Sequence, residues 1–432
     1  MTPAARIKAT IDILSGLGLS RVPMDSTIGD YMRFRRYIGS KDRAEVVERV
    51  YATVRAKARL GWWLEKLSLE DTARNRVLAS MALVQGLTAQ RINYLFDGSK
   101  YGAEELTDAE LDMVKQLEGQ TLEHDDMPEA VAVECPPEAE ADLRGVFGEN
   151  FAEEMRAMLE PAGLDLRINF HMVDMEKVQK FLSADRVETD PTPFSPFGLR
   201  VKGKAYLSTT KAFAKGWIDI QDEGSQLIAL LCDAKPGQQV LDYCAGAGGK
   251  TLALANMMNV KGRIVAMDTE ANRLAKAKDR FRRARVSDII EMRPLNDERH
   301  RKWLRRQKES FDVVLTDVPC SGSGTWRRNP DMRWRQYGPS RDELVEIQAQ
   351  ILEKVVGTVK PGGRLVYATC SLYREENEDQ IENFLKKFPQ FRVLSLQEIW
   401  NGQGNPPNEG PYMRLSPRVS GTDGFFAAVL TC

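Results

Sequence analysis

The stretch Val240-Leu241-Asp242-Tyr243-Cys244-Ala245-Gly246-Ala247-Gly248-Gly249-Lys250-Thr251 decides the fold of the larger part of this chain. It is typical of a buried strand that runs into a glycine-rich turn and then into a helix. Glycine lets the backbone bend tightly and approach a ligand closely. About 24 residues later, Asp268 ends the next predicted strand, where an acid suits the hydroxyls of a ribose. Together, the turn and the acid predict a nucleotide-type site.

The spacing of the glycines separates three kinds of nucleotide site. A Walker phosphate loop is excluded, because Cys244 stands where its first glycine would have to be. A dehydrogenase-type site stays open, although the spacing is G-x-G-G and not G-x-G-x-x-G. A methyl-donor site fits the combination better. We therefore expect S-adenosylmethionine as the cofactor.

From Gln221 onward, strands and helices alternate, which is typical of a doubly wound, mostly parallel α/β sheet. The predicted strands are 239–243, 263–267, 289–293, 311–316, 363–367 and 424–430. Ligands of such sheets bind at the carboxyl edge of the strands.

Two cysteines follow two of these strands. Cys320 stands in Asp317-Val318-Pro319-Cys320, just after strand 311–316, and Cys370 stands in Ala368-Thr369-Cys370-Ser371, just after strand 363–367. If the strands are parallel neighbours, which lie about 5 Å apart, both thiols emerge at one edge of the sheet. That arrangement suits a nucleophile and a helper better than a structural core.

The first 125 residues or so are predicted to be helical, because apolar residues recur at three-and-four spacing. One helix is expected over 43–60. This region carries many basic residues, which fit either a solvated helical face or a phosphate-binding surface: Arg33, Arg35, Arg36, Lys41, Arg43, Arg55, Lys57 and Arg59.

The acidic, proline-containing stretch 127–140 is predicted to be a linker, and residues 141–220 a small α+β module. In that module we expect a helix over 151–159, a strand over 164–169 and a helix over 175–182. The predicted domains are therefore 1–130, 141–220 and 221–432.

Bulk composition narrows the class of protein. The 432 residues carry 61 Lys and Arg against 62 Asp and Glu, yet acids concentrate between Glu104 and Glu154, so the remainder is basic and compatible with a polyanionic partner. Six scattered cysteines without a C-x-x-C pair argue against a disulfide framework, and three distant histidines argue against a metal site. No apolar run is long enough for a membrane span, and the N-terminus lacks a signal-peptide core. We expect a cytoplasmic protein without metal or membrane partner, with a monomer favoured and the oligomeric state left open.

With these motifs together, the chain resembles the RsmB/Nop-type RNA (cytosine-5) methyltransferase family. The segments that carry the resemblance are 242–250, Asp317 to Gly324, Arg327 to Asp331, Tyr367 to Ser371 with Glu375-Glu376-Asn377, and Gly421 to Phe426. The resemblance covers 221–432 strongly and the small module more weakly, and residues 1–130 resemble the NusB-like RNA-binding domain of bacterial members. Two departures are Gly246-Ala247, where members often carry Ala-Pro, and Pro417 to Ser420, where a common histidine is absent.

The resemblance implies a fold, an activity and residue roles. The fold is a Rossmann-like methyltransferase domain preceded by an all-α NusB-like domain and a small α+β module. The activity is methylation of carbon 5 of a cytosine in RNA, with 16S ribosomal RNA as the expected substrate. Transfer RNA methylation by the same chemistry, or a ribosome assembly factor with incidental catalysis, are the alternatives.

By this resemblance, Cys370 is the nucleophile that adds to the base, and Cys320 assists proton loss and release. Swapped roles stay open in principle, because DNA cytosine methyltransferases use the Pro-Cys thiol. Asp317 and Lys250 contact the base. The remaining roles concern the cofactor, whose binding residues are Cys244, Ala245, Gly246, Ala247, Gly248, Gly249, Lys250, Asp268 for the ribose, Asp297 for the adenine and Asp317. Asn296 is the alternative to Asp297.

A second basic segment interleaves arginine with tryptophan. It could grip phosphates and stack on unpaired bases through Trp326, Arg327, Arg328, Arg333, Trp334 and Arg335. The target base has to leave its stack to meet both thiols, so single-stranded or flipped RNA is the expected substrate.

Overall fold

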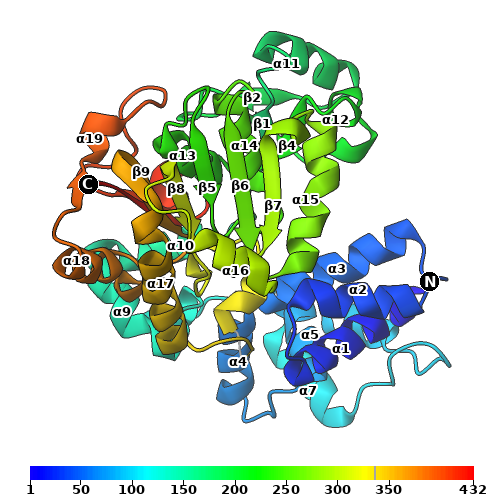
Figure 1. Ribbon diagram of the computed structural model, residues 1–432. Coiled ribbons are helices and arrows are strands. Elements are labelled where there is room, and N and C mark those ends of the chain that lie inside the picture. The colour runs from blue at the N-terminus through cyan, green and yellow to red at the C-terminus, as the bar shows by residue number, and fades with distance from the viewer. Residues whose placement is uncertain (335–336) are drawn as a thin grey trace. The chain divides into compact units, whose positions relative to one another are not determined.

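The structure is a computed structural model that describes residues 1–334 and 337–432, without the side chain of Leu19. The chain divides into two compact units (Figure 1). A helical unit comprises residues 1–160 and 326–338, and a sheet unit comprises residues 161–325 and 339–432. These boundaries differ from those of the three predicted domains, because residues 141–160 and the distant segment 326–338 pack with the N-terminal helices.

The helical unit is built around two clusters of buried aliphatic and aromatic side chains. Its helices are α1 (Pro3–Leu19), α2 (Met24–Phe34), α3 (Ser40–Arg55), α4 (Lys57–Lys66), α5 (Ala73–Leu83), α6 (Ala89–Leu95), α7 (Asp108–Leu117), α8 (Glu129–Ala132), α9 (Pro137–Phe147) and α10 (Phe151–Ala157).

The predicted helix over 43–60 is wrong at its C-terminal end. The backbone breaks at Ala56, where φ is −112° and ψ is 22°. The cause is Glu134, whose carboxylate accepts hydrogen bonds from the N–H groups of Ala58 at 2.8 Å and Arg59 at 3.1 Å. These bonds satisfy the first donors of a new helix, α4, as a capping side chain does.

The predicted linker over 127–140 is also wrong. It contains α8 and the start of α9, and Val133, Glu134 and Cys135 are buried. The side chain of Glu134 is fully buried and forms an ion pair with Arg59 at 2.9 Å. The acidic composition of segment 127–140 therefore reflects a buried ion pair as well as a solvated surface.

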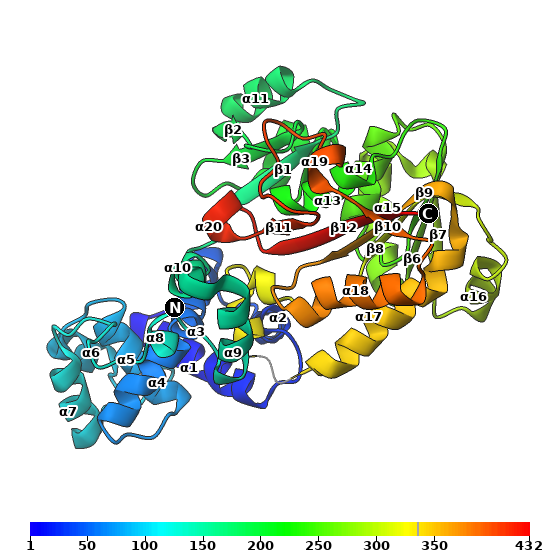
Figure 2. The same cartoon turned by 90° about the vertical axis from the view of Figure 1, so that its left-hand side faces the viewer.

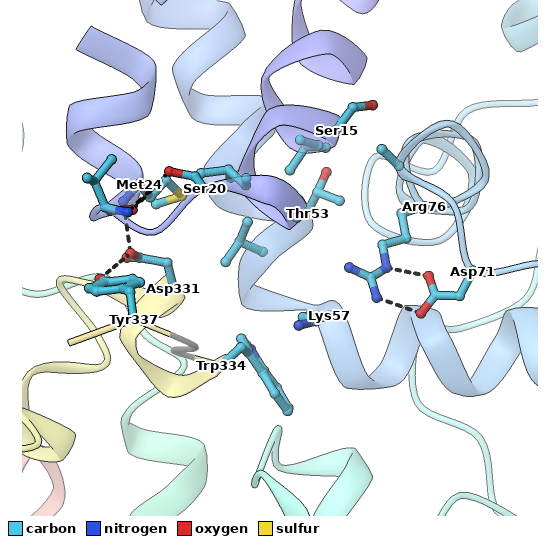
Figure 3. A pocket seen from close by; sticks show the side chains of 16 residues that line it. Ser15, Ser20, Met24, Thr53, Lys57, Asp71, Arg76, Asp331, Trp334 and Tyr337 are labelled. Atoms are coloured by element: carbon cyan, nitrogen blue, oxygen red, sulfur yellow. Dashed lines mark hydrogen bonds and ion pairs between the residues drawn. The ribbon is translucent and has the colours of Figure 1, made fainter. Parts of the chain in front are cut away.

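Segment 326–338 is anchored in the helical unit by polar contacts (Figure 3). Asp331 Oδ2 accepts hydrogen bonds from the first N–H of α2 at Met24, at 2.9 Å, and from the hydroxyl of Tyr337, at 3.1 Å. The ammonium of Lys57 lies 5.1 Å from the centre of the Trp334 ring. These residues line a cavity of about 390 Å³ between α1, α3 and this segment.

The sheet unit contains an eight-stranded and a four-stranded sheet. The strands are β1 (Leu164–Ile168), β2 (Thr189–Pro191), β3 (Gly198–Val201), β4 (Ile218–Ile220), β5 (Gln239–Asp242), β6 (Arg263–Asp268), β7 (Ile290–Pro294), β8 (Phe311–Asp317), β9 (Val359–Thr369), β10 (Arg392–Leu394), β11 (Met413–Leu415) and β12 (Phe425–Thr431). The large sheet has the order β10-β12-β9-β8-β5-β6-β7, with β11 paired to β12. Pairings from β9 to β7 are parallel and those of β12 are antiparallel.

Helices cover both faces of the large sheet. The helices of the sheet unit are α11 (Met175–Ala184), α12 (Lys211–Ala214), α13 (Glu223–Cys232), α14 (Gly249–Met257), α15 (Ala271–Arg283), α16 (Glu298–Leu304), α17 (Arg341–Val355), α18 (Glu378–Lys387), α19 (Leu396–Ile399) and α20 (Pro417–Ser420), of which α11 and α12 contact the smaller sheet. Figure 2 shows α13 and α14 on one face of the large sheet and α17 and α18 on the other. Successive strand residues point to opposite faces, so Val313 packs towards α13 and α14, and Val314 towards α17 and α18. The predicted α/β fold with a mostly parallel sheet and a helical N-terminal region is confirmed.

The smaller sheet has the order β2-β3-β1-β4 and is antiparallel throughout. It shares one apolar core with α13 and α14, which ties residues 161–220 to the large sheet. Among the described residues, no helix is both long and apolar enough to cross a membrane, and no group of acids, cysteines and histidines is placed to hold a metal ion.

Candidate functional site at the carboxyl edge of the large sheet

The two cysteines lie side by side at the carboxyl edge of the large sheet. Strands β8 and β9 are parallel neighbours, with Asp317 opposite Ala368 in the register. Cys320 lies three residues beyond the end of β8, and Cys370 directly follows β9. Their sulfur atoms are 3.4 Å apart. The predicted proximity of the two thiols is confirmed.

The loop that follows Cys320 is bonded to the backbone of Cys370. The N–H of Gly324 donates to the carbonyl of Cys370 at 2.9 Å, and the N–H of Gly424 donates to the carbonyl of Gly324 at 2.8 Å. A Cβ atom at Gly324 would lie 2.1 Å from the carbonyl oxygen of Gly424. No side chain fits there, so glycine is needed for the close approach of the two loops.

A buried carboxylate, Glu376, joins the two cysteine loops. Its Oε1 accepts hydrogen bonds from the N–H of Ser321 at 2.8 Å and from Nε2 of Gln348 at 2.9 Å. Its Oε2 accepts from the Ser321 hydroxyl at 2.5 Å and from the Ser371 hydroxyl. Ser321 follows Cys320 and Ser371 follows Cys370, so one side chain fixes both loops.

Asn377 adds a second connection to the Cys370 loop. Its side-chain oxygen accepts a hydrogen bond from the hydroxyl of Thr369 at 2.6 Å, and its side-chain nitrogen donates to the carbonyl of Ser371 at 3.0 Å. The sequence singled out Glu376 and Asn377 only as part of a resembling segment and assigned them no role. Both residues follow Cys370 closely in sequence, and this short separation could have suggested that they contact the Cys370 loop.

Lys250 and Asp317 form an ion pair at the same edge, with Nζ 2.7 Å from Oδ2. Burial lowers the pKa of Lys250, but the charges of Asp317 and Cys370 and the hydrogen bond to Asp317 outweigh it, so the pKa is raised. Lys250 therefore carries a positive charge that interacts with the Cys370 sulfur.

The contact between the two sulfurs affects the pKa of Cys320. The hydrogen bond with Cys370, and then burial, raise the pKa of the Cys320 thiol well above its usual range. Cys320 therefore keeps its proton at neutral pH and can donate a hydrogen bond to the Cys370 sulfur.

The glycine-rich turn lies between β5 and α14 and has two left-handed residues, Gly246 with φ of +55° and Gly248 with φ of +77°. A Cβ atom at Gly248 would lie 2.6 Å from the ring of Phe281 on α15. The carboxylate of Asp268 accepts hydrogen bonds from the N–H groups of Gly246 and Glu270, both at 2.7 Å. This brings the predicted ribose-binding acid against the glycine turn.

Two arginines that the sequence did not single out hold the carbonyl groups of this turn. Arg280 donates to the carbonyl of Ala247 at 2.6 Å, and Arg167 of the smaller sheet donates to the carbonyl of Gly249 at 2.9 Å. Their separation in sequence from the turn gave no signal of these contacts.

Asp242 is fully buried beneath the turn. Its Oδ2 accepts a hydrogen bond from the Thr251 hydroxyl at 2.6 Å, while Oδ1 has no partner among the described residues. Burial raises the pKa of Asp242 to about 7. A carboxyl with one unsatisfied oxygen below a glycine cradle fits a ligand with hydrogen-bond donors.

Asp297 lies at the start of α16, where its carboxylate pairs with Arg299 at 2.6 Å. The hydrogen bonds from Arg299 lower the pKa of Asp297 to about 2. The neighbouring Asn296 is exposed. A role for Asp297 towards the adenine of a cofactor stays a prediction.

The predicted phosphate-binding segment around Trp326 is wrong in part. Trp326, Arg327 and Arg333 are buried, and the Arg333 guanidinium lies over the Trp326 ring and donates to the carbonyl of Met158. These side chains hold the segment in the helical unit and are not a surface for RNA. Arg328 and Trp334 are partly exposed, and Arg335 lies outside the described residues.

A doubly wound sheet with a glycine turn after β5 and an acid at the end of β6 is a Rossmann-like fold. Residues 229–431 match the family described as 16S rRNA methyltransferase RsmB/F.

Known proteins resemble the chain over different lengths. A probable ribosomal RNA small subunit methyltransferase B of Bacillus subtilis (strain 168) is 32% identical over 282 residues, which are 65% of this chain and 62% of that protein. The chain thus matches about six tenths of the length of this relative. The crystal structure of PH0851 has a TM-score of 0.76 and 26% identity, and the match covers 100% of this chain and 99% of that chain. A methyltransferase homolog protein from Pyrococcus horikoshii has a TM-score of 0.58 and 28% identity over 70% of this chain and 97% of that chain.

Proposed function

We propose that the chain is an S-adenosylmethionine-dependent RNA (cytosine-5) methyltransferase that acts on 16S ribosomal RNA through a covalent cysteine–cytosine adduct. The observation that carries the proposal is the pair of sulfurs 3.4 Å apart beside the Lys250–Asp317 ion pair. The family match and the names of the relatives support the substrate. Transfer RNA is the alternative substrate.

Carbon 5 of cytosine is a poor nucleophile, and addition of a thiolate to the neighbouring carbon 6 activates it. The Cys370 thiolate adds to carbon 6, and the electron pair of the 5,6 double bond makes carbon 5 nucleophilic. Bound S-adenosylmethionine would supply the methyl group to carbon 5, and the electron pair of its broken sulfur–methyl bond would stay on the donor's sulfur, which leaves as a neutral thioether. In this role Cys370 is the catalytic nucleophile, and the positive charge of Lys250 favours its thiolate form.

Cys320 acts after the methyl group has been transferred. Once the Cys370 sulfur is bonded to carbon 6, it no longer accepts the hydrogen bond that is the main reason for the raised pKa of Cys320. Cys320 can then lose its own proton to solvent and, as a thiolate, take the proton from carbon 5. The bond between carbon 6 and the Cys370 sulfur breaks, which restores the double bond and releases the product.

The residues of the glycine turn fit S-adenosylmethionine, which supplies an electrophilic methyl group when bound. Residues 244–250 would hold the donor, Asp268 its ribose and Asp297 its adenine, and Asp317 would lie between donor and base. Both Asp268 oxygens already accept one backbone hydrogen bond each and keep a second lone pair for ribose hydroxyls.

Each part of the chain has its own role, either in methyl transfer or in RNA binding. Residues 221–432 carry the chemistry, while the helical residues 1–130, which we propose to be NusB-like, and the module 141–220 bind RNA. The target cytosine has to be unpaired or flipped to reach both thiols. A ribosomal RNA substrate would place the protein in the cytoplasm.

The test incubates labelled S-adenosylmethionine and small-subunit RNA with the wild type, Cys370→Ala and Cys320→Ala. We expect product from the wild type, none from Cys370→Ala, and a protein–RNA adduct stable on denaturing gels from Cys320→Ala. Bisulfite sequencing then maps the modified cytosine. Normal turnover by Cys370→Ala would contradict the assigned nucleophile, and transfer to transfer RNA alone would contradict the ribosomal substrate.

A further inference from the structure

Two aromatic rings stand almost fully in solvent at the turn between α2 and α3. Phe34 is 82% exposed and Tyr37 is 76% exposed. Arg33, Arg36 and Lys41 flank these rings in sequence. We call these five residues the α2–α3 turn surface. Singly exposed apolar residues are common, but two rings between cations within nine residues form a distinct pattern.

The turn is held so that these rings point outward. Ile38 is buried in the core of the helical unit with Met32. Its N–H donates to the carbonyl of Arg35 at 3.0 Å, and its carbonyl accepts from Nε of Arg43 at 2.8 Å. With Ile38 anchored inward and its backbone bonded on both sides, the preceding residues face solvent. The surface is therefore ordered before any partner binds.

The same turn carries a surplus of positive charge. Residues 30–43 contain five basic residues and two acidic ones. Asp42 is occupied by the N-terminal ammonium at 2.7 Å and by Arg6 at 2.8 Å, and Asp30 pairs with Arg33 at 2.9 Å. In the described part of the chain, Arg36 and Lys41 have no carboxylate partner. Their charge is available for a partner.

We propose that the α2–α3 turn surface binds an unpaired stretch of RNA, with Phe34 and Tyr37 stacking on bases and Arg36 and Lys41 contacting phosphates. Aromatic rings stack on any base whose face is open, and cations beside them follow the backbone. A base-paired duplex offers the phosphates but hides the faces of its bases. The proposal rests on the proposed function for its choice of RNA as the partner.

The experiment measures the affinity of the full chain for a short unstructured RNA oligonucleotide labelled with fluorescein, and for a duplex of the same length. The variants are Phe34→Ala with Tyr37→Ala, and Arg36→Gln with Lys41→Gln. The matched control is Tyr101→Ala, because that ring is 74% exposed on the same unit and has a single cation, Lys100, over it, with Glu104 and Glu105 following in sequence. Circular dichroism checks that each variant is folded, as expected for exposed positions.

We expect the loss of both rings to weaken single-strand binding by about twenty-five-fold, from about fivefold for each stacked base. The loss of both cations should lower the slope of log Kd against log salt by about 1.4, at about 0.7 for each phosphate contact. Tyr101→Ala should bind like the wild type, and the duplex should bind more weakly than the single strand.

Wild-type affinity in the ring variant would overturn the proposal, as would equal losses in the ring variant and in Tyr101→Ala. Because binding is measured without methyl transfer, the result is independent of the chemistry at Cys370. A chain that binds RNA through this surface but transfers no methyl group would contradict only the proposed function.

Discussion

The buried carboxylate of Glu376 offers a quantitative test of how the two cysteine loops are held together. In Glu376→Gln, the amide oxygen has to replace Oε1, because the N–H of Ser321 and the amide of Gln348 can only donate there. The amide nitrogen then replaces Oε2, where the hydroxyls of Ser321 and Ser371 can rotate and accept. Every group keeps a partner, but four hydrogen bonds to a charge become neutral.

The expected cost follows from that exchange. A hydrogen bond to a charged group contributes about 1 kcal/mol more than a neutral one, and the lost desolvation cost of the carboxylate offsets part of the total. We expect Glu376→Gln to lower the free energy of unfolding by about 2 kcal/mol. Glu376→Ala leaves the Ser321 N–H and the Gln348 amide without this acceptor, so we expect about 4 kcal/mol.

Urea denaturation measures the stability, and single-turnover methyl transfer measures the effect on the site. Because Glu376 positions both thiols without touching the base, the rate of transfer should fall by at least about tenfold while KM for RNA changes little. The control is Glu375→Gln. Glu375 precedes Glu376 in sequence, but its carboxylate is half exposed and pairs with Arg341 at 3.0 Å. Glu376→Gln with the same urea midpoint and the same rate as Glu375→Gln would refute this account.

Three further predictions concern the same edge of the sheet. Gly324→Ala should abolish methyl transfer in a chain that still binds donor, since its Cβ would collide with the carbonyl of Gly424; unchanged turnover would contradict the close approach. Asp242 has a pKa raised by burial to about 7, so its contribution to stability is complete below about pH 4 and is lost as pH rises through 7. From pH 4 to 8, the free energy of unfolding measured by urea denaturation should therefore fall more for the wild type than for Asp242→Asn, by roughly 4 kcal/mol in total, and parallel curves would contradict it. Lys250→Met should slow alkylation of Cys370 by iodoacetamide at neutral pH, as followed by mass spectrometry of the labelled peptide, because the thiolate loses a nearby positive charge; an equal rate would show that the lysine does not act on the sulfur.

The sequence predicted the large sheet and the meeting of the thiols because both depend on local signals. Apolar runs of strand length marked β5, β6, β8 and β9, and parallel neighbours bring their ends to one edge. The polar contacts that position Cys320 and Cys370 were not predictable in the same way. Glu376 accepts a hydrogen bond from Ser321, which is 55 residues away in sequence, and nothing in the local sequence pattern indicates that these two residues are in contact.

The errors in the helical unit have the same origin. The periodicity of residues 43–60 continues across Ala56, and only the distant carboxylate of Glu134 shows why a new helix begins there. Arginine and tryptophan in 326–334 suggested a surface, but composition does not tell whether a guanidinium covers a neighbouring ring inside a core. Short strands such as β2 and β4 were missed because three residues carry no detectable alternation.

Arg167 bears on how the protein can be divided. Its guanidinium is fully buried, and Nη1 joins the side chain of Gln221 at 2.6 Å to the carbonyl of Gly249. A fragment that begins at residue 221 would therefore keep every residue assigned to chemistry and yet leave that carbonyl without its donor. The minimal catalytic fragment therefore has to include the antiparallel sheet. If a shorter fragment binds S-adenosylmethionine more weakly, the missing Arg167 explains the loss, because all reacting groups are still present.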